Sequence, residues 1–274
     1  MKISVSEMET VTFKDLITVA DGAVSLTLKF SNYVFITEDD LYFKTYLSSL
    51  KYAGCTTIFC LLIGYPFAYF MARAKPTAQP ALLMLVMLPF WTSFLLRVYA
   101  WKGLLSENGW AYDLLVGSGL DQVMASMGLV PAPGQLMNSP FSLVLGMTYT
   151  YLPFMILPLF GNLVKMDLAL LEAAADLGAT PWQTFRHVIL PLIAPSLVGI
   201  GMFGFTLSWD EIARTSQAIG DVNTLPLELQ GLTSTVTTPS IYALGTVTMV
   251  VSFLVMGLTV GLARLLEKRQ RAAP

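Results

Sequence analysis

Five stretches of the chain carry no charged side chain, and each is about as long as a helix that crosses a bilayer. They lie at residues 52–72, 76–96, 141–164, 188–209 and 242–263. Because lipid offers the backbone no hydrogen-bond partner, each stretch must pair its own N–H and C=O groups within a helix. The pattern therefore predicts an all-α integral membrane protein, a polytopic helix bundle with five spans.

The composition supports this class. Of the 274 residues, 55% are hydrophobic and 12% are charged, whereas about a quarter of the residues of an average soluble domain are charged. So few charged residues could not coat a soluble core, which argues against a water-soluble enzyme. The net charge of −2 offers no basic field for nucleic acid.

The loops between the spans predict an orientation. Alternating spans place 73–80, 165–187 and 264–274 on one side, where eight basic residues face four acidic ones. The remainder holds eight basic and 14 acidic residues, so the first side is predicted to be cytoplasmic, with the C-terminus inside. The expected division is an extracytoplasmic N-terminal segment (1–51), a transmembrane domain (52–263) with a cytoplasmic loop at 165–188, and a basic tail (264–274).

That cytoplasmic loop reads as two short helices joined by a turn. Asp167 is a suitable N-cap for a helix over 168–177, and Gly178 is a typical C-cap residue. Thr180 then predicts a second N-cap, with Pro181 in the first helical position and Gln183 completing a capping box.

The first of these helices has an apolar face without an obvious cover. Leu170, Ala174 and Leu177 share one side at helical spacing. A groove on a partner protein could receive such a face. On periodicity alone, the membrane surface or the protein's own bundle could cover it equally well.

The spacing within the loop carries a resemblance. Glu172-Ala173-Ala174 is followed after three residues by Gly178, then after nine by Val188, and then by Leu190-Pro191. This resembles the EAA signature of the membrane subunits of bacterial ABC importers, although that family usually has Ile at the position of Val188. The resemblance implies that the loop docks into a cleft of a cytoplasmic ATPase. The residues it assigns to this coupling are Glu172, Ala173, Ala174, Asp176, Leu177, Gly178, Pro181, Leu190 and Pro191.

Other segments extend the resemblance over most of the chain. Residues 62–70, 88–93, 96–101 and 171–179 are similar to permeases of the spermidine/putrescine importer group. Those permeases usually have six helices with both ends inside. The comparison therefore implies that the family's first helix precedes residue 1, a genuine five-helix variant being the alternative.

The resemblance also implies an assembly in the bacterial inner membrane. The expected partners are ABC ATPase subunits, which bind ATP and Mg²⁺, a second homologous permease, a periplasmic solute-binding protein and the membrane lipid. The chain itself is predicted to be non-catalytic and without a cofactor: it has no Walker-type phosphate loop, and its single histidine, His187, cannot form a metal site alone.

Residues near the outer ends of the spans are candidates for the solute path. Trp209, Asp210 and Glu211 combine an aromatic face with carboxylates, which suits the ammonium groups of a polyamine. Trp91, Tyr149 and Tyr151 are weaker candidates, because Trp and Tyr often lie at membrane interfaces for other reasons.

Alternatives to polyamine import stay open at this point. The same importer class moves amino-acid-like solutes, aminophosphonates and ferric iron. An ion-coupled secondary transporter would be expected to carry carboxylates within its spans, which this chain lacks. A non-transporting membrane scaffold would not need the ATPase-docking turn.

Overall fold

The computed structural model describes residues 40–210 and 239–272, residue 231, and short pieces between residues 8 and 34. The chain forms two compact units, Met1–Lys51 with Asn223–Met256 and Tyr52–Val222 with Gly257–Pro274. Two long helices, α2 (Asp40–Arg73) and α13 (Pro239–Ala272), contribute to both units.

The first unit contains two small antiparallel hairpins that the all-helical prediction did not include. Strand β1 (Met8–Glu9) pairs with β2 (Thr12–Phe13), and β3 (Ile17–Ala20) pairs with β4 (Ala23–Leu26). Asp21-Gly22 separates β3 from β4 in the sequence, a dipeptide favoured between strands joined by two residues. Short strands of this kind lack the long apolar pattern on which the prediction rested.

Four of the five predicted spans are confirmed as long apolar helices. The apolar segments are Phe43–Arg73 in α2, Pro140–Val164 (α7), Pro181–Trp209, which ends with α10 (Leu190–Trp209), and Tyr242–Leu265 in α13. Their boundaries differ from the uncharged stretches chiefly at the N-terminal end. Helix α2 begins at Asp40 rather than near residue 52, because its first turns carry polar residues that still favour a helix.

The second predicted span is bent rather than straight. Residues 76–96 contain α3 (Gln79–Met87), the 3-10 turn η2 (Leu88–Trp91) and the start of α4 (Phe94–Leu105), which continues beyond the predicted end. The axes of Gln79–Trp91 and Leu96–Gly117 differ by 88°, and counting this pair as one span gives five. Thr92 and Ser93 have extended backbones, and the Thr92 hydroxyl donates to the Pro89 carbonyl at 2.7 Å. A side chain that competes for a backbone carbonyl in this way favours a break in the helix.

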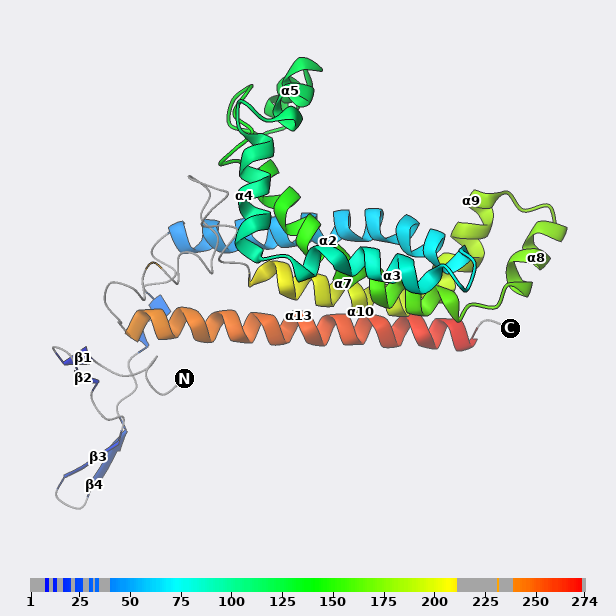
Figure 1. The fold of residues 1–274 in the computed structure, drawn as a ribbon. Coiled ribbons are helices and arrows are strands. Elements are labelled where there is room, and N and C mark those ends of the chain that lie inside the picture. Colours follow the sequence, from blue (N-terminus) through cyan, green and yellow to red (C-terminus); the bar gives the residue numbers. More distant parts are fainter. Residues whose placement is uncertain are drawn as a thin grey trace. The chain divides into compact units, whose positions relative to one another are not determined.

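Among the described residues, helix α7 supplies more of the buried core of the second unit than any other helix, and it packs between α2 and α10 (Figure 1). The Cys60 thiol of α2 donates to the Thr148 carbonyl of α7 at 3.6 Å, and Ile156 lies 3.5 Å from the position of a Cβ on Gly64. The buried core residues are Tyr52, Cys60, Ala68, Met71, Leu143, Met147, Tyr151, Met155, Ile156, Leu159, Leu163, Met166, Ile189, Ile193 and Ile200.

A smaller hydrophobic cluster lies at the C-terminal end of α4. Helices α5 (Trp110–Gly117) and α6 (Leu120–Ser126) pack with the following loop around Leu105, Met124, Val130 and Leu136. The buried Asp121 carboxylate accepts a hydrogen bond from the Gly134 N–H at 3.0 Å. Gly134 has φ +79°, a conformation that glycine adopts readily, and so the loop can turn back to α7.

Different short helices lie at the two ends of the second unit. Helices α8 (Ala169–Asp176) and α9 (Pro181–Thr184) lie at the end where α2 finishes, and α4 and α5 lie at the other end (Figure 1). The carboxyl end of α13 lies at the α8–α9 end (Figure 1). The loops 73–80 and 165–187 therefore share one end, as the alternation of spans predicts.

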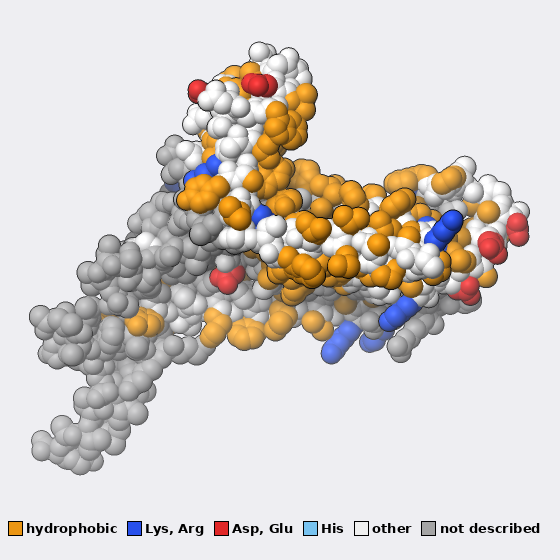
Figure 2. Space-filling model, viewed as in Figure 1, with side chains coloured by type: hydrophobic (Ala, Val, Ile, Leu, Met, Phe, Trp, Pro, Cys, Tyr) orange, Lys and Arg blue, Asp and Glu red, His pale blue; other side chains and the backbone are white. Residues whose placement is uncertain are grey.

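Large apolar side chains cover much of the visible surface of the second unit (Figure 2). Large hydrophobic residues of α2 that are exposed include Ile58, Phe59, Leu62, Phe67 and Phe70. Soluble proteins rarely expose so continuous an apolar face, whereas lipid or a membrane partner covers it at no cost. The surface thus supports the membrane assignment independently of the helix lengths.

Gly204 provides a test of the α7–α10 packing. A Cβ at this position would meet the Met155 thioether, with Sδ at 2.9 Å, whereas a Cβ at Gly199 on the same helix meets nothing within 4 Å. Overpacking costs about 1–3 kcal/mol, so Gly204→Val should lower the thermal stability of the detergent-purified protein. Gly199→Val serves as the matched control, and equal unfolding temperatures for both variants would contradict the packing described here.

Candidate functional site

The loop between α7 and α10 begins with a helix whose two ends are both capped. The Asp167 carboxylate accepts a hydrogen bond from the Ala169 N–H at 3.0 Å, which satisfies one of the free donors at the start of α8. At the other end the Gly178 N–H donates to the Ala175 carbonyl at 2.9 Å, and the Ala179 N–H donates to the Ala174 carbonyl at 3.0 Å. With Gly178 at φ +76°, this is a Schellman turn, as the sequence predicts.

The second predicted helix runs directly into the membrane span. The Thr180 N–H donates to Gln183 Oε1 at 2.8 Å, and the Gln183 N–H donates to Thr180 Oγ1 at 3.3 Å, which confirms the capping box. After α9 the helix widens into a π turn, η3 (Phe185–Ile189), and then continues as α10. The sequence predicts a separate short helix before a span starting at Val188, whereas the structure has one continuous helix from Pro181 to Trp209.

Aromatic side chains fasten this loop to the bundle. Phe185 of η3 lies 5.0 Å from Tyr65 of α2 between ring centroids, and Tyr65 in turn lies 6.0 Å from Tyr69. The Arg73 guanidinium lies 5.2 Å from the Tyr69 ring centroid, within the range of a cation–π contact. Trp182 of α9 packs against Phe185 at 5.4 Å.

Helix α8 presents one side to the bundle and the other to the outside. Leu171 packs against the core and Ala174 is buried. Leu170 is exposed, and Leu177 is 88% exposed at the tip. The predicted common face of Leu170, Ala174 and Leu177 is therefore divided, because Ala174 turns toward the bundle and the two leucines do not.

The outward surface of the loop combines apolar and acidic groups. Leu168, Leu170, Leu177 and Trp182 are exposed, and Trp182 is 66% exposed. Acidic side chains gather over α8 at this end of the unit (Figure 2), where Asp167, Glu172 and Asp176 are all exposed. An apolar tip bordered by carboxylates can fit an apolar groove with a basic rim.

Most of the residues predicted to couple to an ATPase lie on this surface. Those that are exposed are Glu172, Ala173, Asp176, Leu177, Gly178, Pro181, Leu190 and Pro191, and Ala174 is buried. The residues predicted from the sequence do not include Trp182 and Phe185. The adjacent Pro-Trp pair in the first turn of α9 was the available signal for Trp182.

The candidates for the solute path come from three parts of the second unit. Trp91 in η2 is 78% exposed, and Tyr151 of α7 belongs to the buried core. Tyr149 of α7 meets Trp101 of α4 edge-on, with ring centroids 5.4 Å apart.

The remaining candidates lie at the end of α10. Trp209 is half-buried, its ring centroid 5.8 Å from that of Phe205, and Asp210 is exposed. Glu211 lies outside the described residues.

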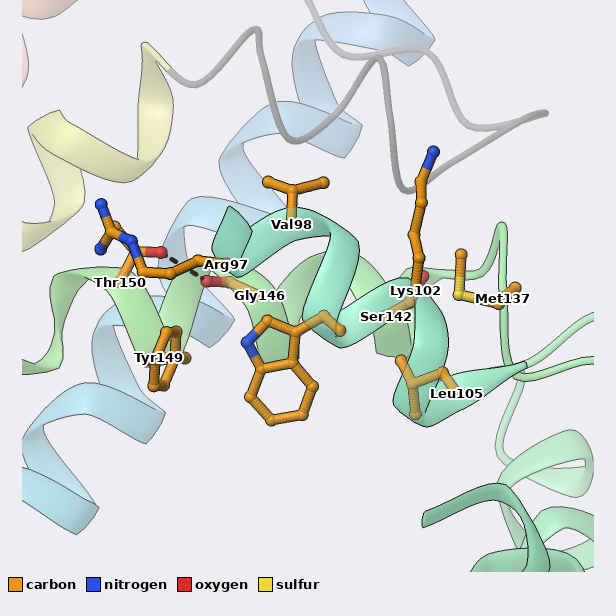
Figure 3. A pocket seen from close by; sticks show the side chains of 10 residues that line it. Arg97, Val98, Lys102, Leu105, Met137, Ser142, Gly146, Tyr149 and Thr150 are labelled. Carbon is orange, nitrogen blue, oxygen red and sulfur yellow. Dashed lines mark hydrogen bonds between the residues drawn. The ribbon is translucent and has the colours of Figure 1, made fainter. Parts of the chain in front are cut away.

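A small pocket, partly open to solvent, lies between α4 and α7. Figure 3 shows its lining, which consists of Arg97, Val98, Trp101, Lys102, Leu105, Met137, Ser142, Gly146, Tyr149 and Thr150. Of the predicted path residues, Tyr149 contributes to it. Within the described ranges no group of three His, Cys, Asp or Glu side chains is placed to hold a metal ion.

Residues 60–271 match the family of binding-protein-dependent transport system inner membrane components. The chain belongs to this family. The matched residues include the bent span, the α8–α9 loop and α10. The chain is accordingly a multi-pass inner membrane component of a binding-protein-dependent transport system, and its curated relatives include permease proteins of transport systems.

Curated relatives of this permease include spermidine/putrescine transport system permeases. PotB of Haemophilus influenzae is 44% identical over 158 residues, which are 58% of this chain and 52% of that protein. PotB of Escherichia coli is 38% identical over 175 residues, 64% of this chain and 60% of that protein. The permease thus spans between half and two thirds of the length of these relatives.

Solved structures of ABC importers share the fold. A bacterial transporter involved in import of the acidic polysaccharide alginate has a TM-score of 0.62 at 16% identity, covering 86% of this chain and 84% of that one. The MetNI methionine transporter in an inward-facing conformation has a TM-score of 0.56 at 15% identity, covering 80% and 93%. The expected permease fold of the ABC importers is therefore confirmed.

The capping box of α9 can be tested by itself. Thr180→Ala removes the acceptor for the Gln183 N–H, and such losses cost about 1 kcal/mol. Amide hydrogen exchange in α9 should then be about fivefold faster. Thr180→Ser keeps the hydroxyl and should exchange at the wild-type rate; if Thr180→Ala did so too, the box would not stabilise the start of α9.

Proposed function

We propose that this permease is the transmembrane subunit of an ATP-driven importer and that the α8–α9 loop receives the force of a separate ATPase. The main support is that the residues with the EAA spacing form an exposed helix, α8, which is capped at both ends and followed by a turn. This shape presents Leu177 and Trp182 outward on a rigid backbone. Apolar side chains held in this way are suited to a groove on another protein.

The connection of the loop to the bundle supports a mechanical role. Because α9, η3 and α10 form one continuous helix, a displacement of the loop is transmitted to α10 without an intervening flexible linker. The contact between Phe185 and Tyr65 carries the same displacement to α2. ATP-driven closure of the ATPases would thus rock the helices and open the path to one side and then to the other.

The proposed assembly comprises two ATPase subunits, a second homologous permease and a periplasmic solute-binding protein. The ATPases would hold ATP and Mg²⁺. The loops 73–80 and 165–187 lie at one end of the second unit together with the end of α13 (Figure 1), and the excess of basic residues in these loops favours a cytoplasmic position. The C-terminus would then be cytoplasmic, and α5 and α6 would lie near the solute-binding protein.

A polyamine is the proposed solute. The support comes from the spermidine/putrescine permeases among the relatives and from the chemistry of the end of α10, where Asp210 follows an aromatic pair. A carboxylate beside aromatic faces attracts ammonium groups.

A charge at the tip of α8 tests the coupling. Leu177→Asp places a carboxylate where an apolar contact is proposed, and Glu172→Lys reverses the charge on the same helix. Each should reduce capture of the co-expressed ATPase by the tagged permease at least about tenfold, which corresponds to about 1.4 kcal/mol. ATP-dependent uptake should fall in parallel.

The matched control is Leu114→Asp, which alters an exposed leucine on α5 at the other end of the unit. This variant should capture the ATPase as the wild type does. Undiminished ATPase capture by both Leu177→Asp and Glu172→Lys would refute the docking role of α8.

Uptake measurements test the solute. Cells that express the complete importer should accumulate labelled spermidine or putrescine, and Asp210→Asn should lower uptake about fivefold at subsaturating concentration through the loss of about 1 kcal/mol of attraction. Asp210→Glu, which keeps the carboxylate, is the matched control and should retain most of the uptake. Accumulation of a different solute without polyamine uptake would overturn the polyamine assignment and leave the ATPase-coupling role intact.

A further inference from the structure

The end of α2 carries three side chains that form one row, here called the α2 row. Tyr65, Tyr69 and Arg73 are spaced four residues apart, so they are neighbours on one face of the helix. The tyrosine ring centroids are 6.0 Å apart, and the guanidinium carbon of Arg73 lies 5.2 Å from the centroid of the Tyr69 ring. Each member therefore contacts the next, and the row ends where α2 ends.

The α2 row meets the α8–α9 loop through Phe185 of η3. The Phe185 ring centroid lies 5.0 Å from that of Tyr65 and 5.4 Å from that of Trp182, which is exposed in the first turn of α9. Phe185 and both tyrosines also pack against the same hydrophobic core. A series of ring contacts thus connects the outward surface of the loop with the last turn of α2.

Arg73 is held by the Tyr69 ring rather than by hydrogen bonds. Its Nε and Nη2 are buried and have no hydrogen-bond partner among the described residues. The side-chain amide of Gln79 donates to the carbonyls of Ala72 and Ala74 at 3.4 and 3.2 Å, so these two carbonyls have a cap other than Arg73. Buried, unpaired donors on a cation cost free energy, and natural proteins accept such costs chiefly at functional sites.

We propose that the α2 row is a second part of the coupling site, in which Arg73 is a positioning residue that holds the tyrosine rings against Phe185. This inference rests on the proposed function of the α8–α9 loop. Packed side chains have low compressibility and transmit strain. A displacement of the loop would therefore reach α10, which continues from η3, and α2, which the rings hold to η3, at the same time. Without the row, α10 would move and α2 would lag behind.

The test measures whether α2 follows the loop when ATP binds to the complete importer. Spin labels are attached at Phe70→Cys on α2 and Arg186→Cys on η3, both at exposed positions, in a background with Cys55→Ala and Cys60→Ala. With an intact α2 row, the distance between the labels should stay constant on addition of ATP and vanadate, because both helices move together. This measurement needs no transported solute.

Removing a ring or the guanidinium should separate the two movements. In Tyr65→Leu and in Arg73→Gln, the distance should change on addition of ATP and vanadate by about 2 Å, the scale of helix shifts in switching proteins. Tyr65→Phe keeps the ring and should behave as the wild type does. Should Arg73→Gln fold poorly, Arg73→Lys keeps the charge but loses the planar group that stacks on the ring, and it should give a smaller change.

The matched control for Arg73→Gln is Lys75→Gln. This substitution removes an exposed charge two residues further along the chain, outside the α2 row. The distance between the labels should then stay constant, as it does in the wild type. A change equal to that in Arg73→Gln would assign the effect to the charge of this end of the protein and overturn the positioning role of Arg73.

Capture of the co-expressed ATPase separates this inference from the docking role on which it rests. Tyr65→Leu and Arg73→Gln should capture the ATPase as the wild type does, because they leave the outward surface of α8 unchanged. A label distance that stays constant in both variants, or that changes equally in the wild type, would overturn the role of the α2 row and leave docking intact. Failure of the wild type to capture the ATPase would refute docking, and this inference with it.

Discussion

The inability of lipid to hydrogen-bond the backbone is the constraint on which the second unit depends. Its central helix, α7, contains Pro153 and Pro158, neither of which has an N–H to donate. The Asn162 side-chain amide donates to the Pro158 carbonyl at 2.8 Å, and the Ser196 hydroxyl of α10 donates to Asn162 Oδ1 at 3.2 Å. Polar side chains thus link the proline-containing part of α7 to α10, within an otherwise apolar contact.

This link lies where the α8–α9 loop joins the bundle. Asn162 is in the last turn of α7, and Ser196 is in the first half of α10, shortly after the π turn. A π turn contains one more residue than an ordinary turn and often marks functional sites in helices. The loop is thus attached through continuous helix, hydrogen bonds and aromatic packing together, which favours movement as a body over local bending.

Local sequence rules account for much of this fold and for less of the site. Uncharged length predicts the four unbroken spans, because placing a charge in lipid is costly whatever the neighbours are. Thr180, Gln183 and Gly178 predict their turns because capping depends on residues only a few positions apart. The bend at Thr92 depends on whether the Thr92 hydroxyl bonds to the Pro89 carbonyl, which the residue types alone do not decide. The burial of Ala174 depends on where the helix bundle lies relative to α8. Likewise, the Arg97 pocket requires α4 to lie against α7, a contact between residues about 50 positions apart that no periodicity encodes.

The distribution of charge limits how the proposed polyamine could cross. The predicted spans contain no carboxylate, and the Arg97 pocket repels cations, so ammonium groups would depend on neutral acceptors within the membrane. A proline in a helix leaves the carbonyl four residues earlier without its usual donor; for Pro158 this is the carbonyl of Phe154. Carbonyls released in this way coordinate cations in transporters with interrupted helices. Weak neutral acceptors hold an ammonium group only briefly, which favours release, and the carboxylates at the end of α10 would then serve mainly to concentrate the solute at the entrance.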